Sequence, residues 1–313
     1  MSLFLKNGII YTDYGLPEEK ELDILKAIVI GLIQGITEFL PVSSSGHLAI
    51  FSKIFKMELD STILFEVMLH FGTLVSIIVV FREDIWRLLR EFFYILLTCI
   101  ANFCIWIKRI SGDKSYKYIK VISNSYRKLV IFVIVSSIPT AMLGFLSADL
   151  VEKASGSLLV VGICMMITAV VLVIADVLPR GKDHIKDVPY PGAFLLGIAQ
   201  GIATFPGISR SGATISCGMM IGMTKKTAVR YSFIMSIPVV LGATLLKLID
   251  LSKEPVNVAQ VPAYVVGTLV AGITGYFSIK YMLKMVRRHR YYGFAVYCAV
   301  LSVVAIVFSI INR

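Results

Sequence analysis

Residues 31–46 read GLIQGITEFLPVSSSG, and residues 197–212 read GIAQGIATFPGISRSG. Laid over each other without a gap, the two stretches carry the same residue at eight of sixteen positions, Gly31/Gly197, Gln34/Gln200, Gly35/Gly201, Ile36/Ile202, Phe39/Phe205, Ser43/Ser209, Ser45/Ser211 and Gly46/Gly212. In each copy a short apolar helical run stops at Pro41 or Pro206 and resumes after a Ser-rich turn. Proline lacks an amide hydrogen and clashes with the preceding turn, so the helix must break there. The sequence therefore predicts two broken helices that carry polar groups within apolar sequence.

The composition is that of a multi-pass membrane protein. Hydrophobic residues make up 57% of the chain and charged residues 16%, whereas soluble globular proteins are about 45–50% apolar. The net charge of +11 comes from Lys and Arg scattered between apolar segments, which is typical of cytoplasmic loops and not of a nucleic-acid surface. The five cysteines lie in apolar segments without metal-ligand spacing, so we expect neither disulfides nor a zinc site. Membrane lipids are expected partners, and nucleic acid is not.

The first broken helix is too short to cross a membrane. The apolar run from Ile24 to Leu40 reaches about 25 Å at 1.5 Å per residue, short of the roughly 30 Å hydrocarbon core. It also ends in a carboxylate, a proline and three serines. Irregular backbone at membrane depth persists only where protein or a water-filled cavity satisfies it. We therefore expect a re-entrant half-helix followed by a segment at 47–55 that returns to the same side of the membrane. A second re-entrant pair is expected at 190–222.

Six apolar stretches are expected to span the membrane, at about 62–81, 128–147, 157–178, 231–249, 263–283 and 293–311. Three spans, an odd number, separate the two re-entrant pairs, so the two halves enter from opposite sides. We predict an all-α polytopic membrane protein, an inverted-topology repeat with six transmembrane helices plus two re-entrant helix pairs. The chain would be a single integral membrane domain, 1–313, with internal repeats at about 24–147 and 157–311.

A further apolar stretch, 92–107, complicates the count of spans. If it does not span, the Lys- and Arg-rich loops, including 82–127 and 222–230, share one side of the membrane. If it does span, this asymmetry disappears, and the positive-inside rule therefore favours the first topology. We interpret about 83–127 as a basic cytoplasmic insertion with an interfacial helix. The N-terminal segment and the first re-entrant turn are then placed outside.

The two Ser-rich turns carry the candidate chemistry, which is Glu38, Ser43, Ser44, Ser45 and His47 in the first turn and Ser209, Arg210, Ser211 and Thr214 in the second. Each turn precedes a helix start, where free amides and the positive dipole end favour an anion. Arg210 adds a planar fork suited to phosphate oxygens. An intramembrane Arg costs about 2.5–3.5 kcal/mol on insertion scales, so an anion should compensate it. We expect the turns to meet and form one phosphate site.

Each of these residues also has a purely structural interpretation. The serines at 43–45 can act as helix caps, and His47 can be a hydrogen-bonded helix histidine. Arg210 can simply pair with Glu38 to hold the halves together. The recurrence of such groups in two related turns favours the catalytic interpretation.

Two further features of the sequence have alternative interpretations. Glu66 and His70 lie four residues apart on one span, either as pocket-lining groups or as a structural polar pair. Glycines recur in both copies, at 31, 35, 197 and 201, where they are expected to allow close helix packing.

The strings QGITEFLPVSSSGH at 34–47 and PGISRSGAT at 206–214 resemble the two signature motifs of the undecaprenyl-diphosphate phosphatase family, also called bacitracin-resistance proteins. The resemblance covers nearly the whole chain, including FEV at 65–67, but not the N-terminal extension or the 83–127 insertion. It implies an integral enzyme of the bacterial cytoplasmic membrane, with its site open toward the outer face. Such an enzyme hydrolyses undecaprenyl diphosphate to undecaprenyl phosphate and inorganic phosphate, which recycles the lipid carrier of peptidoglycan synthesis and gives bacitracin resistance.

Carried over by position, the family's functional residues fall on Glu38, Ser44, His47, Ser209, Arg210 and Thr214. The other candidate substrate contacts are Gln34, Ser43, Ser45, Ser211 and Glu66. The family often has Glu at the position of Gln34, where an amide supplies no negative charge. The resemblance also implies a divalent cation, Mg²⁺ or Ca²⁺, bound with the diphosphate. Glu38 is the motif carboxylate left to contact this metal, because Mg²⁺ is commonly held by one or two carboxylates and phosphate oxygens.

These residues predict phosphoryl transfer in which positioning and charge stabilisation supply most of the catalysis. Arg210 and hydroxyls of the second turn hold the diphosphate, and Ser44 or a water molecule attacks the terminal phosphorus. Glu38 or His47 takes the proton, and the other orients it.

A prenyl-phosphate lipid transporter, or flippase, is the alternative function. Inverted repeats with broken helices at the midplane suit transport, and the same anion-binding groups suit a lipid head group. A structural or receptor protein would not explain polar residues at membrane depth in two copies. A homodimer is one of the assemblies that the sequence allows.

Overall fold

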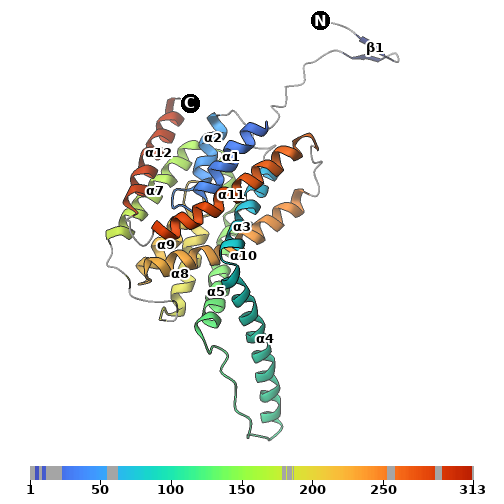
Figure 1. The fold of residues 1–313 in the computed structure, drawn as a ribbon, viewed down its shortest axis with the longest axis vertical. Helices are drawn as coiled ribbons and strands as arrows, with labels where there is room; N and C mark the ends of the chain where they lie inside the picture. Colours follow the sequence, from blue (N-terminus) through green and yellow to red (C-terminus); the bar gives the residue numbers. More distant parts are fainter. Residues whose placement is uncertain are drawn as a thin grey trace.

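The computed structural model describes residues 4–6, 9–11, 23–54, 63–177, 181, 185, 187–251, 258–285 and 291–311. In these ranges the chain forms two short antiparallel strands, twelve α-helices and one 3₁₀ turn. They are β1 (Phe4–Lys6), β2 (Ile9–Tyr11), α1 (Ile24–Thr37), α2 (Ser44–Ile54), α3 (Ile63–Val80), α4 (Arg82–Ile110), α5 (Ser125–Leu146), α6 (Ala148–Ser155), α7 (Leu158–Val177), α8 (Tyr190–Ile202), α9 (Arg210–Met220), α10 (Lys225–Leu251), η2 (Val258–Gln260), α11 (Val261–Met285) and α12 (Tyr292–Ile311). The helices pack into one bundle from which α4 projects (Figure 1). The prediction of an all-α polytopic membrane protein is confirmed, with the strand pair as an addition.

Both predicted broken helices are present. The first is α1 followed by α2, with Pro41 in the turn between them, and the second is α8 followed by α9, with Pro206 in the turn. Each first half-helix ends before the proline, at Thr37 or Ile202. This agrees with the restriction that proline places on the residue before it, which disfavours helical backbone there.

The two halves of the chain interlock through equivalent glycines. α1 lies against α11, and α8, its counterpart in the second half, lies against α5. A methyl group added at Gly31 would lie 2.5 Å from the carbonyl oxygen of Gly267 in α11. One added at Gly197 would lie 2.1 Å from the carbonyl oxygen of Ser136 in α5. Small residues let helix backbones approach this closely, so the close-packing interpretation of these glycines is confirmed.

Within the described part of the chain, six helices are long and apolar enough to cross a membrane, namely α4, α5, α7, α10, α11 and α12. The number agrees with the prediction, but one member differs. α4 qualifies by length and composition, whereas α3, the predicted span at 62–81, is a shorter apolar helix. α3 nevertheless lies inside the bundle against α10 and α11, with Phe65, Leu69 and Leu74 buried. The side chains of α4 are mostly exposed, and Ile95 is its buried residue.

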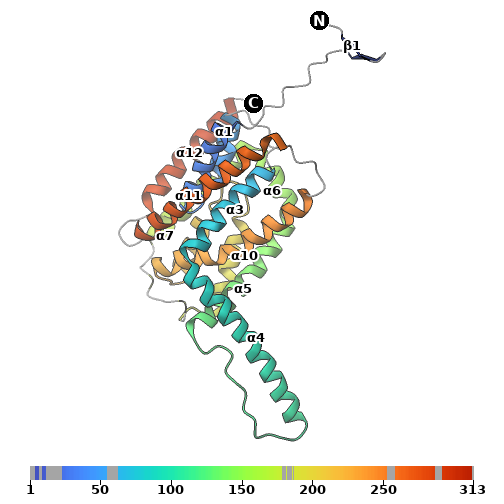
Figure 2. The same cartoon turned by 45° about the vertical axis from the view of Figure 1, so that its right-hand side comes forward.

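The insertion that contains α4 leaves and rejoins the bundle at one end. Asp84 at the start of α4 accepts hydrogen bonds from Arg230 Nε of α10 at 3.0 Å and from the Tyr126 hydroxyl of α5 at 3.0 Å. Asp176 at the end of α7 accepts from Lys225 Nζ at the start of α10 at 3.0 Å, and from the first backbone amide of α12 at 2.7 Å. The described helix ends that border the loops predicted to share one side of the membrane therefore lie at the same end of the bundle. Figure 2 shows α4 leaving the bundle there.

We expect Gly197→Ala to lower the thermal unfolding temperature of the purified protein in detergent. The new methyl group must push α8 away from α5, and overpacking of this kind costs about 1–3 kcal/mol. Gly242→Ala is the matched control, since an added methyl in this α10 position meets nothing within 4 Å. Alanine is favoured over glycine inside a helix by about 0.5–1 kcal/mol, so the control should keep or raise the midpoint. Equal midpoints for the two variants would contradict the close-packing account.

Candidate active site

A serine caps the second half-helix of each copy. Ser43 Oγ accepts a hydrogen bond from the Gly46 amide at 3.1 Å, and Ser209 Oγ accepts one from the Gly212 amide at 3.0 Å. Such caps satisfy an amide that would otherwise be free at the helix start. Ser43 also has a φ of 68°, in the left-handed region that residues with side chains seldom adopt. The capping interpretation therefore holds for Ser43 and Ser209, which are also candidate functional residues.

The tips of the two re-entrant hairpins meet. Ser45 Oγ accepts a hydrogen bond from the Gly207 amide at 3.1 Å, and Ser211 Oγ donates one to the Leu40 carbonyl at 3.0 Å. Gly207 has a φ of 94°, and an added methyl group would lie 2.3 Å from the carbonyl oxygen of Val161. Only glycine fits this position. Ser45 and Ser211 thus join one tip to the other.

Glu38, Ser44 and Arg210 come together where the tips meet. Arg210 Nη2 donates to Glu38 Oε1 at 2.5 Å, and the Ser44 hydroxyl donates to Glu38 Oε2 at 2.7 Å. The side chains of Glu38 and Arg210 are 5% and 20% exposed, so this ion pair is largely removed from solvent. Glu38 directly follows α1 as its C-cap, Ser44 begins α2 and Arg210 begins α9. The predicted encounter of the acid, a hydroxyl and the guanidinium is present.

Gln34 and His70 complete this cluster. The Gln34 amide nitrogen donates to Glu38 Oε2 at 2.9 Å and lies 3.2 Å from His70 Nδ1. An amide nitrogen can only donate, so the network assigns Nδ1 as an acceptor and places the His70 proton on Nε2. His70 Nδ1 also lies 3.6 Å from Glu38 Oε1, but the shorter contact to Gln34 decides the tautomer. Glu38 therefore accepts hydrogen bonds from a guanidinium, a hydroxyl and an amide.

Two atoms of the cluster are left without partners. Among the described residues, Arg210 Nη1 and Gln34 Oε1 are buried and make no hydrogen bond. A buried donor or acceptor that stays unsatisfied costs about 1–3 kcal/mol, and more when it is charged. The unpaired guanidinium nitrogen suits an anionic oxygen, and the unpaired amide oxygen suits a cation or a donor. The site is therefore built to receive a ligand.

His47 lies apart from this cluster. Its Nδ1 is 2.6 Å from the Ser43 carbonyl oxygen, and its Nε2 is 2.7 Å from the hydroxyl of Tyr297 in α12. The two rings also stack, with centroids 5.5 Å apart. A carbonyl only accepts, so Nδ1 carries the proton and Nε2 accepts from Tyr297. Both ring nitrogens are thus engaged, and His47 holds the left-handed turn at Ser43.

Thr214 and Glu66 also lie away from the centre of the cluster. The Thr214 hydroxyl donates to the Arg210 carbonyl at 2.8 Å and contacts the Ser232 hydroxyl of α10 at 2.6 Å, and the residue is fully buried. Glu66 lies one helical turn before His70 on α3 and forms no hydrogen bond or ion pair with any residue that the structure describes. The structure thus favours neither a Glu66–His70 pair nor an open Thr214 hydroxyl.

The donor set limits how a metal ion can bind. The described part of the chain contains no group of three or more His, Cys, Asp or Glu side chains arranged to hold a metal. Mg²⁺ and Ca²⁺ prefer oxygen ligands, including amide oxygens. The unpaired Gln34 Oε1 is such an oxygen, and the amide nitrogen of the same side chain contacts Glu38. These residues fit a cation that is held mainly by the oxygens of a bound ligand.

The sequence pattern gave only part of this site. His70 was noted for its spacing from Glu66, but nothing in the pattern connected it with Gln34 and Glu38. Tyr297 and Thr168 were not singled out, although Thr168 Oγ1 accepts from the Ser209 amide at 3.0 Å and donates to the Gly207 carbonyl at 3.1 Å. Both come from helices that meet the turns only in the folded bundle.

The contact between Glu38 and Arg210 should be measurable as a coupling free energy. Glu38→Gln and Arg210→Met are each expected to destabilise the protein by about 3 kcal/mol, because removal of one partner leaves a buried charge uncompensated. The double variant should lose less than the sum of the two, with a coupling of about 1–3 kcal/mol. Chemical unfolding in detergent micelles gives all three values. Strict additivity would show that the two residues do not interact.

The chain is similar in sequence to one family of known proteins. The family model described as bacitracin resistance protein BacA matches residues 27–304. An undecaprenyl-diphosphatase from Alkaliphilus metalliredigens is 34% identical over 91% of this chain and 98% of its own. Proteins of the same name from Methanosphaera stadtmanae and Halothermothrix orenii are 36% and 33% identical, over 93% and 92% of this chain and 99% of each relative. The chain belongs to the BacA family of bacitracin resistance proteins.

Proposed function

We propose that this protein hydrolyses undecaprenyl diphosphate to undecaprenyl phosphate and inorganic phosphate. The observation that carries the proposal is the contact of Ser44 and Arg210 with opposite oxygens of one carboxylate, Glu38, where the two tips meet. A nucleophile hydrogen-bonded to a base, next to a fixed positive charge, is the arrangement that phosphoryl transfer requires. The family membership and the relatives named undecaprenyl-diphosphatase support the choice of substrate.

In this proposal Ser44 is the nucleophile and Glu38 is the base. The Ser44 hydroxyl already donates to Glu38 Oε2, so its proton passes to that oxygen as Oγ bonds to the terminal phosphorus. The bond from this phosphorus to the bridging oxygen breaks, and undecaprenyl phosphate leaves with the electron pair. Water then attacks the phosphorus of the phosphoserine, and the bond from phosphorus to Oγ breaks. Glu38 gives its proton back to Ser44 Oγ, and inorganic phosphate leaves with the oxygen and protons of the water.

Arg210 is proposed to bind the diphosphate through Nη1, the guanidinium nitrogen without a partner among the described residues. Its Nη2 stays on Glu38, so a single guanidinium would hold both the base and the substrate. The starts of α2 and α9 add free amides, which attract anions. The charge that spreads over the phosphoryl oxygens during transfer is stabilised by such preorganised donors.

His47 is proposed to position the site and not to transfer the proton. Its Nδ1 proton is donated to the Ser43 carbonyl, and its Nε2 accepts from Tyr297. It therefore fixes the residue that directly precedes Ser44. Of the two bases that the sequence left open, the geometry supports Glu38.

A divalent cation is proposed to bind with the substrate through Gln34 Oε1 and Glu38. When bound, such an ion neutralises charge on the diphosphate oxygens. Gln34 would contribute its free amide oxygen, while its amide nitrogen keeps the Glu38 carboxylate in place.

The protein is an integral membrane protein, and we place it in the cytoplasmic membrane with the end that carries α4 inside. The gathering of basic loops at that end supports this orientation. The site would then open toward the outer face.

Phosphate release from a prenyl diphosphate should depend on all three central residues. With purified protein in detergent, Glu38→Gln and Ser44→Ala are each expected to lower kcat by at least about 100-fold, the range for loss of a base or nucleophile. Arg210→Ala should lower it by about 1,000-fold or more, as loss of a phosphate-stabilising arginine does. Near-normal turnover by Ser44→Ala would mean that water attacks directly. Near-normal turnover by Arg210→Ala would refute the site.

Thr204→Ala is the matched control for these variants. Thr204 occupies in the second copy the position of Glu38 in the first, and its hydroxyl donates to the Gly201 carbonyl at 2.7 Å. Turnover of this variant should remain close to that of the wild type.

Movement of the head group across liposomes without phosphate release would favour a transporter.

The cation should be detectable through Gln34. Chelation is expected to stop phosphate release, and Mg²⁺ or Ca²⁺ to restore it. Gln34→Leu should raise the cation concentration needed for half-maximal rate by about 10-fold, since loss of a supporting ligand costs about 10–100-fold in metal affinity. Gln200→Leu, the equivalent change in the second copy, should leave this concentration unchanged. If both variants needed the same cation concentration for half-maximal rate, Gln34 would not be a metal ligand.

A further inference from the structure

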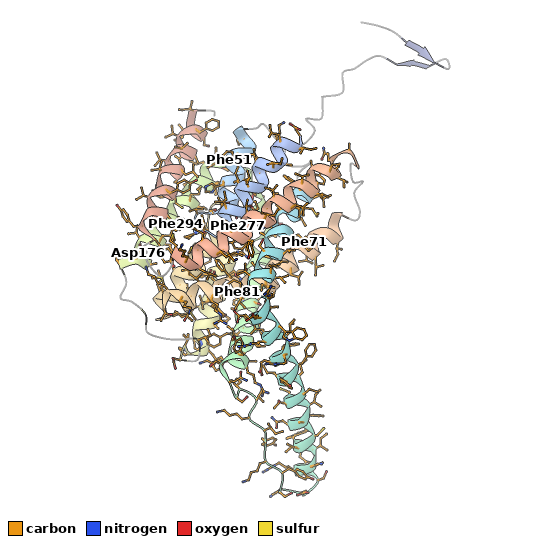
Figure 3. All side chains as sticks on the ribbon, in the orientation of Figure 1. Phe51, Phe71, Phe81, Asp176, Phe277 and Phe294 are labelled. Atoms are coloured by element: carbon orange, nitrogen blue, oxygen red, sulfur yellow. The ribbon has the colours of Figure 1, made fainter. Side chains whose placement is uncertain are left out.

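The outer face of α4 is apolar from Trp86 to Ile107. Exposed apolar residues recur every three or four positions, including Trp86, Leu89, Phe93, Leu96, Ile100 and Phe103. At 100° per residue these positions fall on one side of the helix. Both tryptophans of the chain lie on α4, with Trp86 69% exposed and Trp106 49% exposed. Phe81 marks the junction at which α4 leaves α3 (Figure 3).

The opposite face of α4 is already occupied by the chain that returns to α5. The side-chain amide of Asn102 exchanges two hydrogen bonds with the backbone of Ile119, each 2.8 Å long. Arg109 donates to the Tyr116 carbonyl at 2.7 Å. The return segment is thereby held on the polar side, so it cannot fold over the apolar face.

The insertion is also strongly basic. Residues 82–127 contain nine Lys and Arg and four Asp and Glu. Lys114, Lys117 and Lys120 are exposed in the return segment. At the base, Arg127 Nε donates to Glu91 at 2.9 Å, and Asp84 accepts from Arg230, which fixes the start of the helix to the bundle. Lys114, Lys117 and Lys120 remain available to an external anionic surface.

These features distinguish a lipid surface from a second copy of the chain. A two-stranded coiled coil needs a narrow apolar seam flanked by charged positions. Here the flanking positions are apolar and exposed as well, as at Phe92, Leu97 and Cys104. Two such arms would also bring like charges together. A wide aromatic face with cations beside it is typical of a helix in the interface of an anionic leaflet.

We propose that α4 lies in the interface of the anionic leaflet next to the basic end of the bundle. Its apolar face is buried among the lipid head groups and upper acyl chains, and Lys114, Lys117 and Lys120 contact lipid phosphates. The arm thereby anchors that end of the enzyme to acidic phospholipids. This inference is independent of the proposed hydrolysis.

Tryptophan quenching tests the proposal in the full-length protein, because the natural tryptophans are confined to α4. In a Trp86→Phe/Trp106→Phe background, Leu96→Trp places a probe on the apolar face, and Tyr94→Trp places a matched probe on the opposite side. The proteins are reconstituted in liposomes of anionic or zwitterionic lipid, with bromine near the head group or near the acyl-chain ends. Circular dichroism checks that each variant is folded.

We expect bromine near the head group to quench the Leu96→Trp probe about twofold more than the Tyr94→Trp probe, as an interfacial helix requires. Quenching should be stronger in anionic liposomes, and replacing Lys114, Lys117 and Lys120 with Gln should reduce that difference. Strongest quenching by bromine near the chain ends would overturn the proposal, because α4 would then cross the bilayer. Equal quenching of the two probes would also overturn it. The proposal would also be overturned if no bromine quenched the Leu96→Trp probe and the probe became more shielded from solvent as the protein density in the liposomes rose. That result would indicate that a second copy covers the apolar face.

Discussion

The ion pair between Glu38 and Arg210 is the interaction on which the rest of the site depends. The two residues lie 172 positions apart in the chain and 2.5 Å apart in space. In a membrane interior neither charge is tolerated alone, so each tip is held against the other by the cost of separating them. The hydrogen bond that Ser45 accepts from Gly207 and the one that Ser211 donates to Leu40 fix the backbone around this pair. The broken helices, their caps and the close glycine contacts all bring one carboxylate to one guanidinium.

The two copies share a scaffold but not a chemistry. Capping serines and packing glycines occur in both copies and make equivalent contacts in each half. The tip serines also recur, and each bonds to the backbone of the opposite tip. Where the first copy has Glu38 and Ser44, the second has Thr204 and Arg210. A base and a nucleophile thus come from one turn and the positive charge from the other. The repeated parts bring the two tips together, and the parts that differ supply the reactive groups.

The sequence predicted the elements whose cause is local. Pro41 and Pro206 fix the breaks, and repeated glycines and serines fix the packing and the caps, so these could be inferred from residue type and spacing. The contacts of His47 could not be, because they are made by Tyr297 of a distant helix. The place of His70 in the site could not be inferred for the same reason, because its partner Gln34 lies on a different helix. α4 was hard to separate from a span, because hydropathy is similar for a helix that crosses a bilayer and one that lies on it.

The most direct test is an experimental structure of the protein in a lipid nanodisc with a non-hydrolysable prenyl methylenediphosphonate. The account predicts that the terminal phosphonate lies between Ser44 Oγ and Arg210 Nη1, with Glu38 still bonded to Arg210 Nη2. It further predicts that His47 remains bonded to Ser43 and Tyr297 and does not contact the ligand. A diphosphonate bound elsewhere, or tips held apart with Glu38 and Arg210 out of contact, would contradict the central claim.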